Sequence, residues 1–211
     1  MQIIFLEKVD STHTYLKELI KSEAYTKPLC IATDLQTQGI GSRGNTWQGK
    51  KGNLFFSFVL EKALLPIDLQ LQSASIYFSF ILKEFLSSLG SKIWLKWPND
   101  FYIEDKKIGG TITTATKDLI YCGIGLNLVN VDKSYGKLDI KIEIKNLLKN
   151  YFETLEKYPT WKDIFSEFKI EFHRSKNFQA TLENKKVSLE KATLNEDGSI
   201  QIDNTKVFSL R

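Results

Sequence analysis

The stretch KIWLKWPNDFYIEDKKIGGTITTATKDLIYCGIGLNL, residues 92–128, contains four apolar runs separated by short polar turns. Each run is rich in the β-branched and aromatic residues that are typical of strands. Neighbouring antiparallel strands can be joined by such short turns, whereas a parallel connection needs about a dozen residues or more. The stretch therefore predicts strands at 92–97, 101–105, 107–116 and 119–128 in a mixed, largely antiparallel sheet. With flanking helices this is an α+β fold and not a doubly wound one.

The segments on either side supply further elements. Hydrophobic periodicity predicts strands at 3–9, 29–35 and 54–60 and helical regions at 69–89 and 139–172. Another helix is expected to run from the capping residues Asp10, Ser11 and Thr12 to about Lys21. Within 69–89 the expected core face consists of Ile76, Phe80, Leu82, Phe85 and Leu89.

The residue pattern changes after Ser175, where short apolar pairs alternate with turn signals such as NEDG. This pattern predicts four or five short strands that form a small β module. We therefore expect two domains, residues 1–175 and residues 176–211.

The composition is that of a soluble globular chain, with 211 residues of which 42% are hydrophobic and 26% are charged. The net charge of +4 is dispersed, so it permits an anionic ligand without indicating a nucleic-acid binder. No apolar run reaches the ~18 residues of a membrane span, and no signal peptide is recognisable. Cys30 and Cys122 each lie in an apolar run without a CxxC pair, which predicts buried free thiols and a cytoplasmic location.

The segment WLKWPND, residues 94–100, ends an apolar run at Pro98 and places Asn99 and Asp100 just beyond it. Pro-Asn-Asp is ordinary turn chemistry. A strand that ends in an amide and a carboxylate can also present both groups to a ligand. On these residues alone the turn is the simpler interpretation. The other motifs decide between an ordinary turn and a ligand site.

The segment QTQGIGSRGNTWQGKKGN, residues 36–53, contains five glycines and almost no aliphatic residues. Its glycines let the backbone approach a ligand closely, and successive amides in such a segment can bind an anion. Arg43, Lys50 and Lys51 add positive charge, and Trp47 offers a flat apolar face to a base. The alternative is an ordinary surface loop, because the segment matches neither a P-loop nor a dinucleotide fingerprint.

Two other motifs place unusual residues inside strands. In KKIGG, residues 106–110, glycines follow the lysine pair, and bare backbone in a strand suggests that something packs against it. In YCGIGLNL, residues 121–128, Asn127 interrupts an apolar run, and a buried amide needs partners. Solvated lysines and a β-bulge with a satisfied amide are the alternative interpretations.

The segment DSTHT, residues 10–14, opens the first predicted helix. Ser11 and Thr12 are typical N-cap residues, and a helix N-terminus is also where polar ligands bind. His13 lies on the first turn of this helix, where its side chain can be exposed to solvent. Nothing nearby makes it a catalytic base.

Taken in order, STHTYL, ATDLQTQGIGSRGNTW, LKWPND, KKIGG and GIGLNL resemble the catalytic domain of the biotin protein ligase family. The resemblance covers about residues 3–130, and the closing FSLR resembles the end of that family's small C-terminal SH3-like barrel. It implies a fold related to class II aminoacyl-tRNA synthetases and a reaction in two steps. Biotin and ATP with Mg²⁺ give biotinyl-5′-AMP and pyrophosphate, and a lysine of a biotin carboxyl carrier domain then takes the biotinyl group and releases AMP.

Position by position, the resemblance implies that Lys107 is catalytic, since it supplies positive charge where negative charge accumulates during adenylation. Mg²⁺ is expected to bind with ATP near Asn99 and Asp100, with no residue assigned as a direct metal ligand. The residues implied at the ATP are Arg43, Trp47, Asn99, Asp100 and Asn127. Those implied at biotin are Ser11, Thr12, His13, Gln36, Gly39, Ile40, Gly41, Ser42, Lys107, Gly109, Gly110 and Gly123.

The glycine segment departs from the family pattern GRGRxGRxW, because Ile40, Ser42 and Asn45 stand at its arginine positions. Arg43 falls on a variable position, and His13 replaces the asparagine of the family's STN. We therefore expect the acyl-adenylate to be held differently.

The sequence begins at the catalytic domain without the winged helix of the repressor members, so DNA binding is not expected. The expected partner is a biotin carboxyl carrier domain, with no membrane, and a homodimer is compatible with the resemblance.

Two other functions stay open. A lipoate or octanoate ligase shares the fold, and the acid that supports pyrophosphate release from ATP distinguishes it. A non-enzymatic nucleotide or nucleic-acid binder would show steeply salt-dependent binding and no AMP production.

Overall fold

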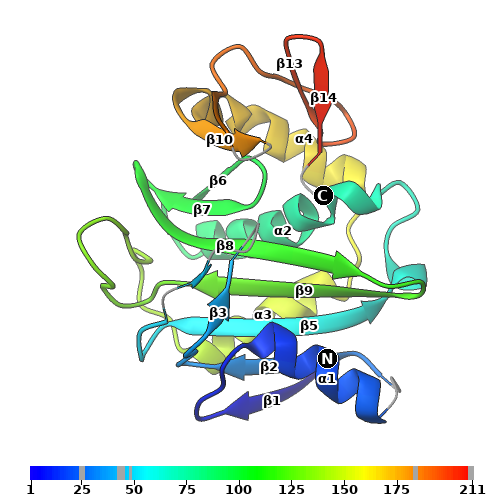
Figure 1. Cartoon of the computed structure of the whole chain (residues 1–211), viewed down its shortest axis with the longest axis vertical. Coiled ribbons are helices and arrows are strands. Elements are labelled where there is room, and N and C mark those ends of the chain that lie inside the picture. The colour runs from blue at the N-terminus through cyan, green and yellow to red at the C-terminus, as the bar shows by residue number, and fades with distance from the viewer. Residues whose placement is uncertain (24–26, 42–45, 48, 183–184, 209–211) are drawn as a thin grey trace.

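The computed structural model describes residues 1–211 except 24–26, 42–45, 48, 183–184 and 209–211 (Figure 1). Its centre is a seven-stranded sheet in the order β1-β2-β5-β9-β8-β7-β6. β1 (Gln2–Leu6) and β2 (Leu29–Thr33) pair in parallel, and every other neighbouring pair of this sheet is antiparallel. The mixed, largely antiparallel sheet predicted from the sequence is confirmed.

Residues 92–128 form consecutive hairpins, as their pattern predicted. The strands are β6 (Trp94–Lys96), β7 (Asp100–Ile103), β8 (Lys106–Ala115) and β9 (Leu119–Leu126). β9 also pairs along its whole length with β5 (Leu54–Glu61), which lies far away in the sequence. This long-range pairing joins the N-terminal strands to the hairpins and places β5 and β9 inside the sheet.

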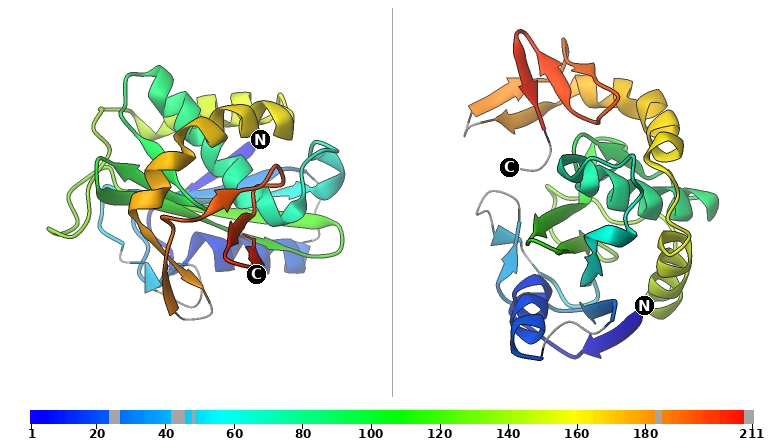
Figure 2. Two further views of the ribbon diagram at one scale, coloured as in Figure 1. Left: turned by 90° about the horizontal axis from the view of Figure 1, so that it is seen from above. Right: turned by 90° about the vertical axis from the view of Figure 1, so that its right-hand side faces the viewer.

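Helices cover both faces of the sheet (Figure 2). On one face, α1 (Thr12–Glu23) contributes Leu16 to a cluster with Ile31, Val59 and Tyr121. The other face packs against α2 (Ala74–Ser88) and α3 (Ile144–Leu155). Side chains alternate between the two faces along a strand, so one strand can serve both layers.

The helical region at 139–172 consists of α3 and α4 (Trp161–Glu171). Phe152 of α3 meets Phe58 of β5 at 5.4 Å between ring centroids. Phe168 of α4 lies 5.8 Å from Phe80 of α2. The region therefore completes the core behind the sheet, and two short 3₁₀ turns, η2 (Lys62–Leu64) and η3 (Leu71–Ser73), lead into α2.

The predicted core face of 69–89 is correct for Ile76, Phe80 and Leu82, which are buried, whereas Phe85 is only partly buried. It is wrong for Leu89, which is 50% exposed. α2 ends at Ser88, so Leu89 no longer follows the helical face.

Five short strands follow the 3₁₀ turn η4 (Phe172–Asn177), in agreement with the predicted β module. They form two small sheets: β10 (Gln179–Leu182) with β11 (Lys185–Ser188), and β12 (Thr193–Leu194) with β13 (Ile200–Ile202) and β14 (Thr205–Val207). The indole Nε1 of Trp97 donates to the carbonyl of Gly198 at 2.9 Å. The two small sheets thus pack onto the larger part of the chain, and the domain boundary after residue 175 stays a prediction.

Cys30 and Cys122 are buried and unpaired, as predicted, and burial raises the pKa of both thiols. No helix among the described residues combines the length and the apolarity that a membrane span requires.

Candidate functional site

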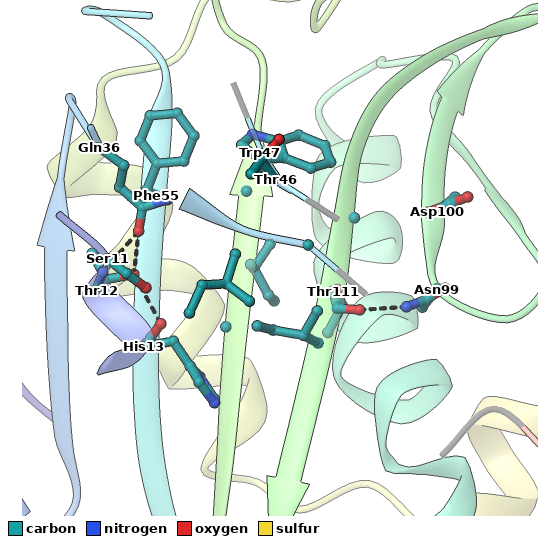
Figure 3. A pocket seen from close by; sticks show the side chains of 18 of the residues that line it. Ser11, Thr12, His13, Gln36, Thr46, Trp47, Phe55, Asn99, Asp100 and Thr111 are labelled. Carbon is teal, nitrogen blue, oxygen red and sulfur yellow. Dashed lines mark hydrogen bonds between the residues drawn. The ribbon is translucent and has the colours of Figure 1, made fainter. Parts of the chain in front are cut away.

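A cavity of about 300 Å³ lies on the α1 face of the sheet (Figure 3). The N-terminal turn of α1 forms one wall, strands β5, β9 and β8 form the floor, and the glycine segment borders it. The described residues of that segment include two short antiparallel strands, β3 (Gly39–Ile40) and β4 (Thr46–Trp47), where the sequence predicted only a loop. The predicted site residues that line the cavity are Ser11, Thr12, His13, Gln36, Ile40, Gly41, Trp47, Asn99, Asp100, Lys107, Gly110 and Gly123.

A buried polar network forms the wall at α1. The backbone N–H and the hydroxyl of Thr12 both donate to Gln36 Oε1, at 2.7 and 2.9 Å. Ser57 Oγ lies 2.9 Å from Thr12 Oγ1. Ser11 Oγ accepts from the N–H of Thr14 at 3.4 Å, which is the predicted capping role.

His13 is only 6% exposed. The solvent exposure that the sequence allowed for this side chain is therefore wrong. The helix lies across the sheet at this turn, and Gly123 below it has no side chain to exclude the imidazole. A Cβ on Gly123 would lie 3.3 Å from His13 Nδ1. The other ring nitrogen, Nε2, lies 3.1 Å from Thr114 Oγ1. Burial, with a smaller contribution from the Lys17 charge, lowers the pKa of His13 to about 4, so the ring is neutral near pH 7.

The opposite end of the cavity is charged. Asp100 accepts from Lys107 Nζ at 2.6 Å through Oδ1, and Lys96 Nζ lies 3.6 Å from its Oδ2. Gly110 pairs with Asp100 across β7 and β8, and a Cβ there would lie 3.2 Å from Asp100 Oδ1. Lys107 and Asp100 line the cavity at this end, whereas Lys96 contacts Asp100 without lining it. The ammonium group of Lys107 suits a phosphate or a carboxylate ligand.

Asn99 shows that the turn and the site are compatible interpretations of WLKWPND. Its side-chain amide donates to the carbonyl of Thr111, and the N–H of Thr111 donates back to the Asn99 carbonyl at 2.9 Å. The preceding Trp97–Pro98 peptide bond is cis. The turn is thus tied to β8, and it places Asn99 and Asp100 at the cavity.

Trp47 packs on the bare backbone of β9. A Cβ on Gly125 would lie 3.2 Å from Cε2 and Nε1 of the indole. Lys107 Nζ lies 5.3 Å from the centroid of the Trp47 ring. A second cavity of about 270 Å³ adjoins the first, and Thr46, Trp47 and Tyr135 line both. The indole therefore stands between two spaces, close to the lysine.

Asn127 lines only the second cavity. Its amide is already satisfied, since Nδ2 donates to the Gly136 carbonyl at 3.1 Å and Oδ1 accepts from Asn53 Nδ2 at 3.3 Å. These bonds hold the segment that carries Tyr135. The amide of Asn127 thus has partners, and its predicted role at the nucleotide stays a prediction.

Two predicted glycines serve packing and do not line the cavity. A Cβ on Gly109 would lie 2.6 Å from the carbonyl oxygen of Gly125, and one on Gly39 would lie 2.6 Å from that of Trp47. Both contacts are with backbone, so neither position has room for a side chain. Ser42, Arg43 and Asn45 lie outside the described residues.

Sequence reasoning missed several lining residues, namely Thr46, Phe55, Ser57, Thr111, Ile112, Ile124, Gly125 and Tyr135. Ser57 carried a signal, because it is a hydroxyl in the middle of the apolar run LFFSFVL. The same argument that drew attention to Asn127 would have found it. Tyr135 carried no such sequence signal, because it follows a polar segment without periodicity.

Residues 5–127 match the biotin/lipoate A/B protein ligase family. The chain belongs to this family. It is 31% identical to biotin–protein ligase 2 of Arabidopsis thaliana over 138 residues, which cover 61% of this chain and 41% of that protein. It is 33% identical to the bifunctional ligase/repressor BirA of Escherichia coli K12 over 133 residues, covering 60% and 40%. The match thus spans less than half the length of these relatives.

Solved structures of similar size match over nearly the whole chain. The biotin acetyl coenzyme A carboxylase synthetase of Helicobacter pylori, solved with bound biotinylated ATP, has a TM-score of 0.93 and 38% identity. The match covers 98% of this chain and 99% of that one. Biotin protein ligase from Aquifex aeolicus, in complex with biotin and ATP, has a TM-score of 0.75 and 25% identity over 100% and 98% of the two chains. The predicted fold class is confirmed by both matches.

Proposed function

We propose that this chain is a biotin–protein ligase. It activates biotin with ATP to biotinyl-5′-AMP and transfers the biotinyl group to a lysine of a biotin carboxyl carrier domain. The observation that carries the proposal is one cavity with two different ends. A neutral wall of hydroxyls, an amide and an imidazole faces a cationic end with an indole beside it, in a chain that matches a biotin acetyl coenzyme A carboxylase synthetase over 98% of its length.

The two ends suit the two substrates. The ureido ring of biotin is neutral and offers N–H and C=O groups, so it fits the wall made by Thr12, His13 and Ser57. The carboxylate of biotin and the phosphates of ATP are anionic, and they fit the end that Lys107 lines. The strands that form the floor would hold the carboxylate and the α-phosphate close together, which lowers the entropic barrier of the first step.

In the first step a carboxylate oxygen of biotin attacks the α-phosphorus of ATP, and the bond to pyrophosphate breaks. Negative charge increases around phosphorus while this happens. The ammonium group of Lys107 would stabilise that charge, and Asp100 would hold the ammonium in place through the 2.6 Å contact. In the second step the amine of the carrier lysine attacks the acyl carbon, loses a proton and displaces AMP.

Mg²⁺ is the expected companion of ATP, whose phosphate charge it would neutralise. The described residues contain no group of three or more His, Cys, Asp or Glu side chains placed to hold a metal ion. Mg²⁺ commonly binds through one or two carboxylates together with substrate phosphates. Asp100 lines the first cavity and Asp132 lines the adjoining one, so the site fits an ion that arrives with the nucleotide.

The cellular setting remains as predicted from the sequence. A cytoplasmic location would provide ATP and keep both buried thiols reduced. The absence of membrane and DNA binding and a homodimeric state stay predictions. Sedimentation of the purified protein, alone and with biotin and ATP, would determine the oligomeric state.

The decisive experiment is incubation of the protein with ATP, biotin and a purified biotin carboxyl carrier domain, followed by mass spectrometry of the carrier. We expect the mass to rise by one biotinyl group and AMP to appear. A carrier whose acceptor lysine is replaced by arginine is the matched control. Replacement of biotin by lipoate tests the related ligase activity, and labelling with lipoate alone would refute the proposal.

A further inference from the structure

The turn between β12 and β13, residues 195–199, packs against the larger part of the chain. It is held internally, since the N–H of Asn195 donates to the Ser199 carbonyl at 2.8 Å and the N–H of Gly198 donates to the Asn195 carbonyl at 2.9 Å. Gly198 has a φ of +79°, and a Cβ there would lie 2.7 Å from Ser73 Oγ. Glycine is therefore needed for both the conformation and the close approach. Such a turn can serve as a fixed point of attachment.

Three successive carbonyls of this turn, those of residues 196–198, accept hydrogen bonds from side chains of the larger part. In chain order the donors are Trp161 Nε1 at 2.8 Å, Ser73 Oγ, and Trp97 Nε1 at 2.9 Å. Trp161 belongs to α4 and Ser73 to η3. Trp97 follows β6 and is fully buried. Two indoles thus make equivalent bonds to one turn from different parts of the fold.

Trp97 is the donor that continues into the cavity. The chain passes from Trp97 through Pro98 to Asn99 and Asp100, which line the cavity. The backbone N–H of Trp97 also donates, to Ser175 Oγ at 3.0 Å. Both N–H groups of Trp97 are therefore bonded to segments that follow α4. This end of the turn that carries Asp100 is held by the C-terminal part of the chain.

We infer that Trp97 is a positioning residue for the adenylation step. Its indole bond to Gly198 fixes the turn that carries Asp100, and Asp100 in turn holds Lys107 Nζ at 2.6 Å. Trp97 does not line the cavity, so its effect on the reaction has to pass through the residues that follow it. The inference rests on the proposed function and adds that the C-terminal strands take part in the geometry of the charged end.

The effect is measurable because rates depend steeply on the placement of reacting groups, and a shift of about 1 Å can cost about 10²-fold. The alternative is that the indole only attaches the small sheets. In that case its loss would lower the stability of the fold and leave the rate of the folded protein unchanged. Trp161 supplies the comparison, because its bond to the same turn does not lead into the cavity.

The test compares Trp97→Phe with Trp161→Phe. Both variants keep an aromatic ring and remove an indole donor to the same turn, so both should lose stability in denaturant titrations. With saturating ATP and biotin, we expect Trp97→Phe to slow pyrophosphate release by about 10- to 100-fold. Its KM for biotin, and the rate of Trp161→Phe, should each change by about twofold or less. Equal slowing in the two variants, or a normal rate in Trp97→Phe, would overturn the inference.

A double-mutant cycle tests the route through the carboxylate. If Trp97 acts by placing Asp100, its bond should matter little once that carboxylate has been replaced. We expect Trp97→Phe to slow the Asp100→Asn variant further by about twofold or less. The same slowing as in the wild-type background would refute this route.

Nitrogen NMR of the wild-type protein gives an answer even where Trp97→Phe does not fold. The chain has four tryptophans, and the Trp97 indole signal can be assigned by elimination from phenylalanine variants at the other three. We expect biotin with α,β-methylene ATP, which cannot form the adenylate, to shift the signals of Trp47 and Trp97 and to leave that of Trp161 in place. A Trp47 signal that moves while Trp97 does not would contradict the inference. No Trp47 shift and no pyrophosphate release by the wild type would instead overturn the proposed function.

Discussion

Replacing Lys107 by alanine removes one of the two ammonium groups that flank Asp100. Lys96 Nζ lies 3.6 Å and Lys107 Nζ 2.6 Å from the Asp100 carboxylate, and of these two lysines Lys107 lines the cavity, so the variant removes the ammonium group that faces the ligands. A unit charge about 4 Å from a developing negative charge is worth ~4 kcal/mol at an effective dielectric constant of about 20. Lys107 is 27% exposed, so solvent screening reduces this value. We expect adenylation to slow by about 10²- to 10³-fold, as when a single oxyanion donor is removed.

The assay is the rate of pyrophosphate release with saturating ATP and biotin. Lys106→Ala is the matched control, since Lys106 is the exposed neighbour on β8 and does not line the cavity. Supplying preformed biotinyl-AMP bypasses the first step and should restore part of the carrier labelling by Lys107→Ala. Near-normal pyrophosphate release by this variant, or an equal loss in Lys106→Ala, would refute the assignment of Lys107.

Three other predictions concern the indole, the glycine segment and the buried imidazole. Trp47→Ala should weaken ATP binding about tenfold or more, since stacking on a base contributes about 1–3 kcal/mol, and should change biotin affinity much less; equal losses in a calorimetric titration would mean that Trp47 orders the whole segment. Ile40 and Ser42 lack the charge-assisted bonds of the family's arginines, each worth about 1.5–3 kcal/mol, so biotinyl-AMP should dissociate faster by about one to three powers of ten and label bystander proteins. Ile40→Arg with Ser42→Arg should slow this dissociation, and an intermediate that stays bound for many minutes in the unaltered protein would contradict the idea. Because the pKa of His13 is lowered to about 4 in the folded state, the unfolded chain binds an additional proton between about pH 6.5 and 4, and stability should fall as the pH falls through this window. Denaturant titrations of His13→Phe should show a shallower pH slope than the wild type, and identical slopes would refute the burial argument.

The order of the hairpins could be predicted from the sequence because the interacting segments are adjacent in the chain. Period-two alternation and short turns between 92 and 128 leave few alternatives to β6, β7, β8 and β9 pairing in succession. The proximity of Asp100 and Lys107 follows from the same hairpin, since they lie on neighbouring strands close to its turn. Such local pairing is encoded without knowledge of the rest of the fold.

Which of two neighbouring glycines lines the cavity could be decided only from the register of the sheet. Gly109 and Gly110 look equivalent in the sequence, but successive residues of a strand face opposite sides. In the pairing of β7 with β8, Gly110 lies opposite Asp100 and lines the cavity, whereas Gly109 packs against the backbone of Gly125. A one-residue difference therefore separates a site residue from a packing residue.

The sequence by itself determined the fold class, the family resemblance and the positions of Lys107, Asp100 and Trp47 in recognisable motifs. Only the tertiary structure decided that His13 is buried and that its Nδ1 has no hydrogen-bond partner among the described residues. The physical reason is that burial and the direction of a hydrogen bond depend on neighbours that arrive from distant segments. Thr12, Gln36 and Ser57 share one network although up to 45 residues separate them, and no local pattern specifies which of them gives up its proton.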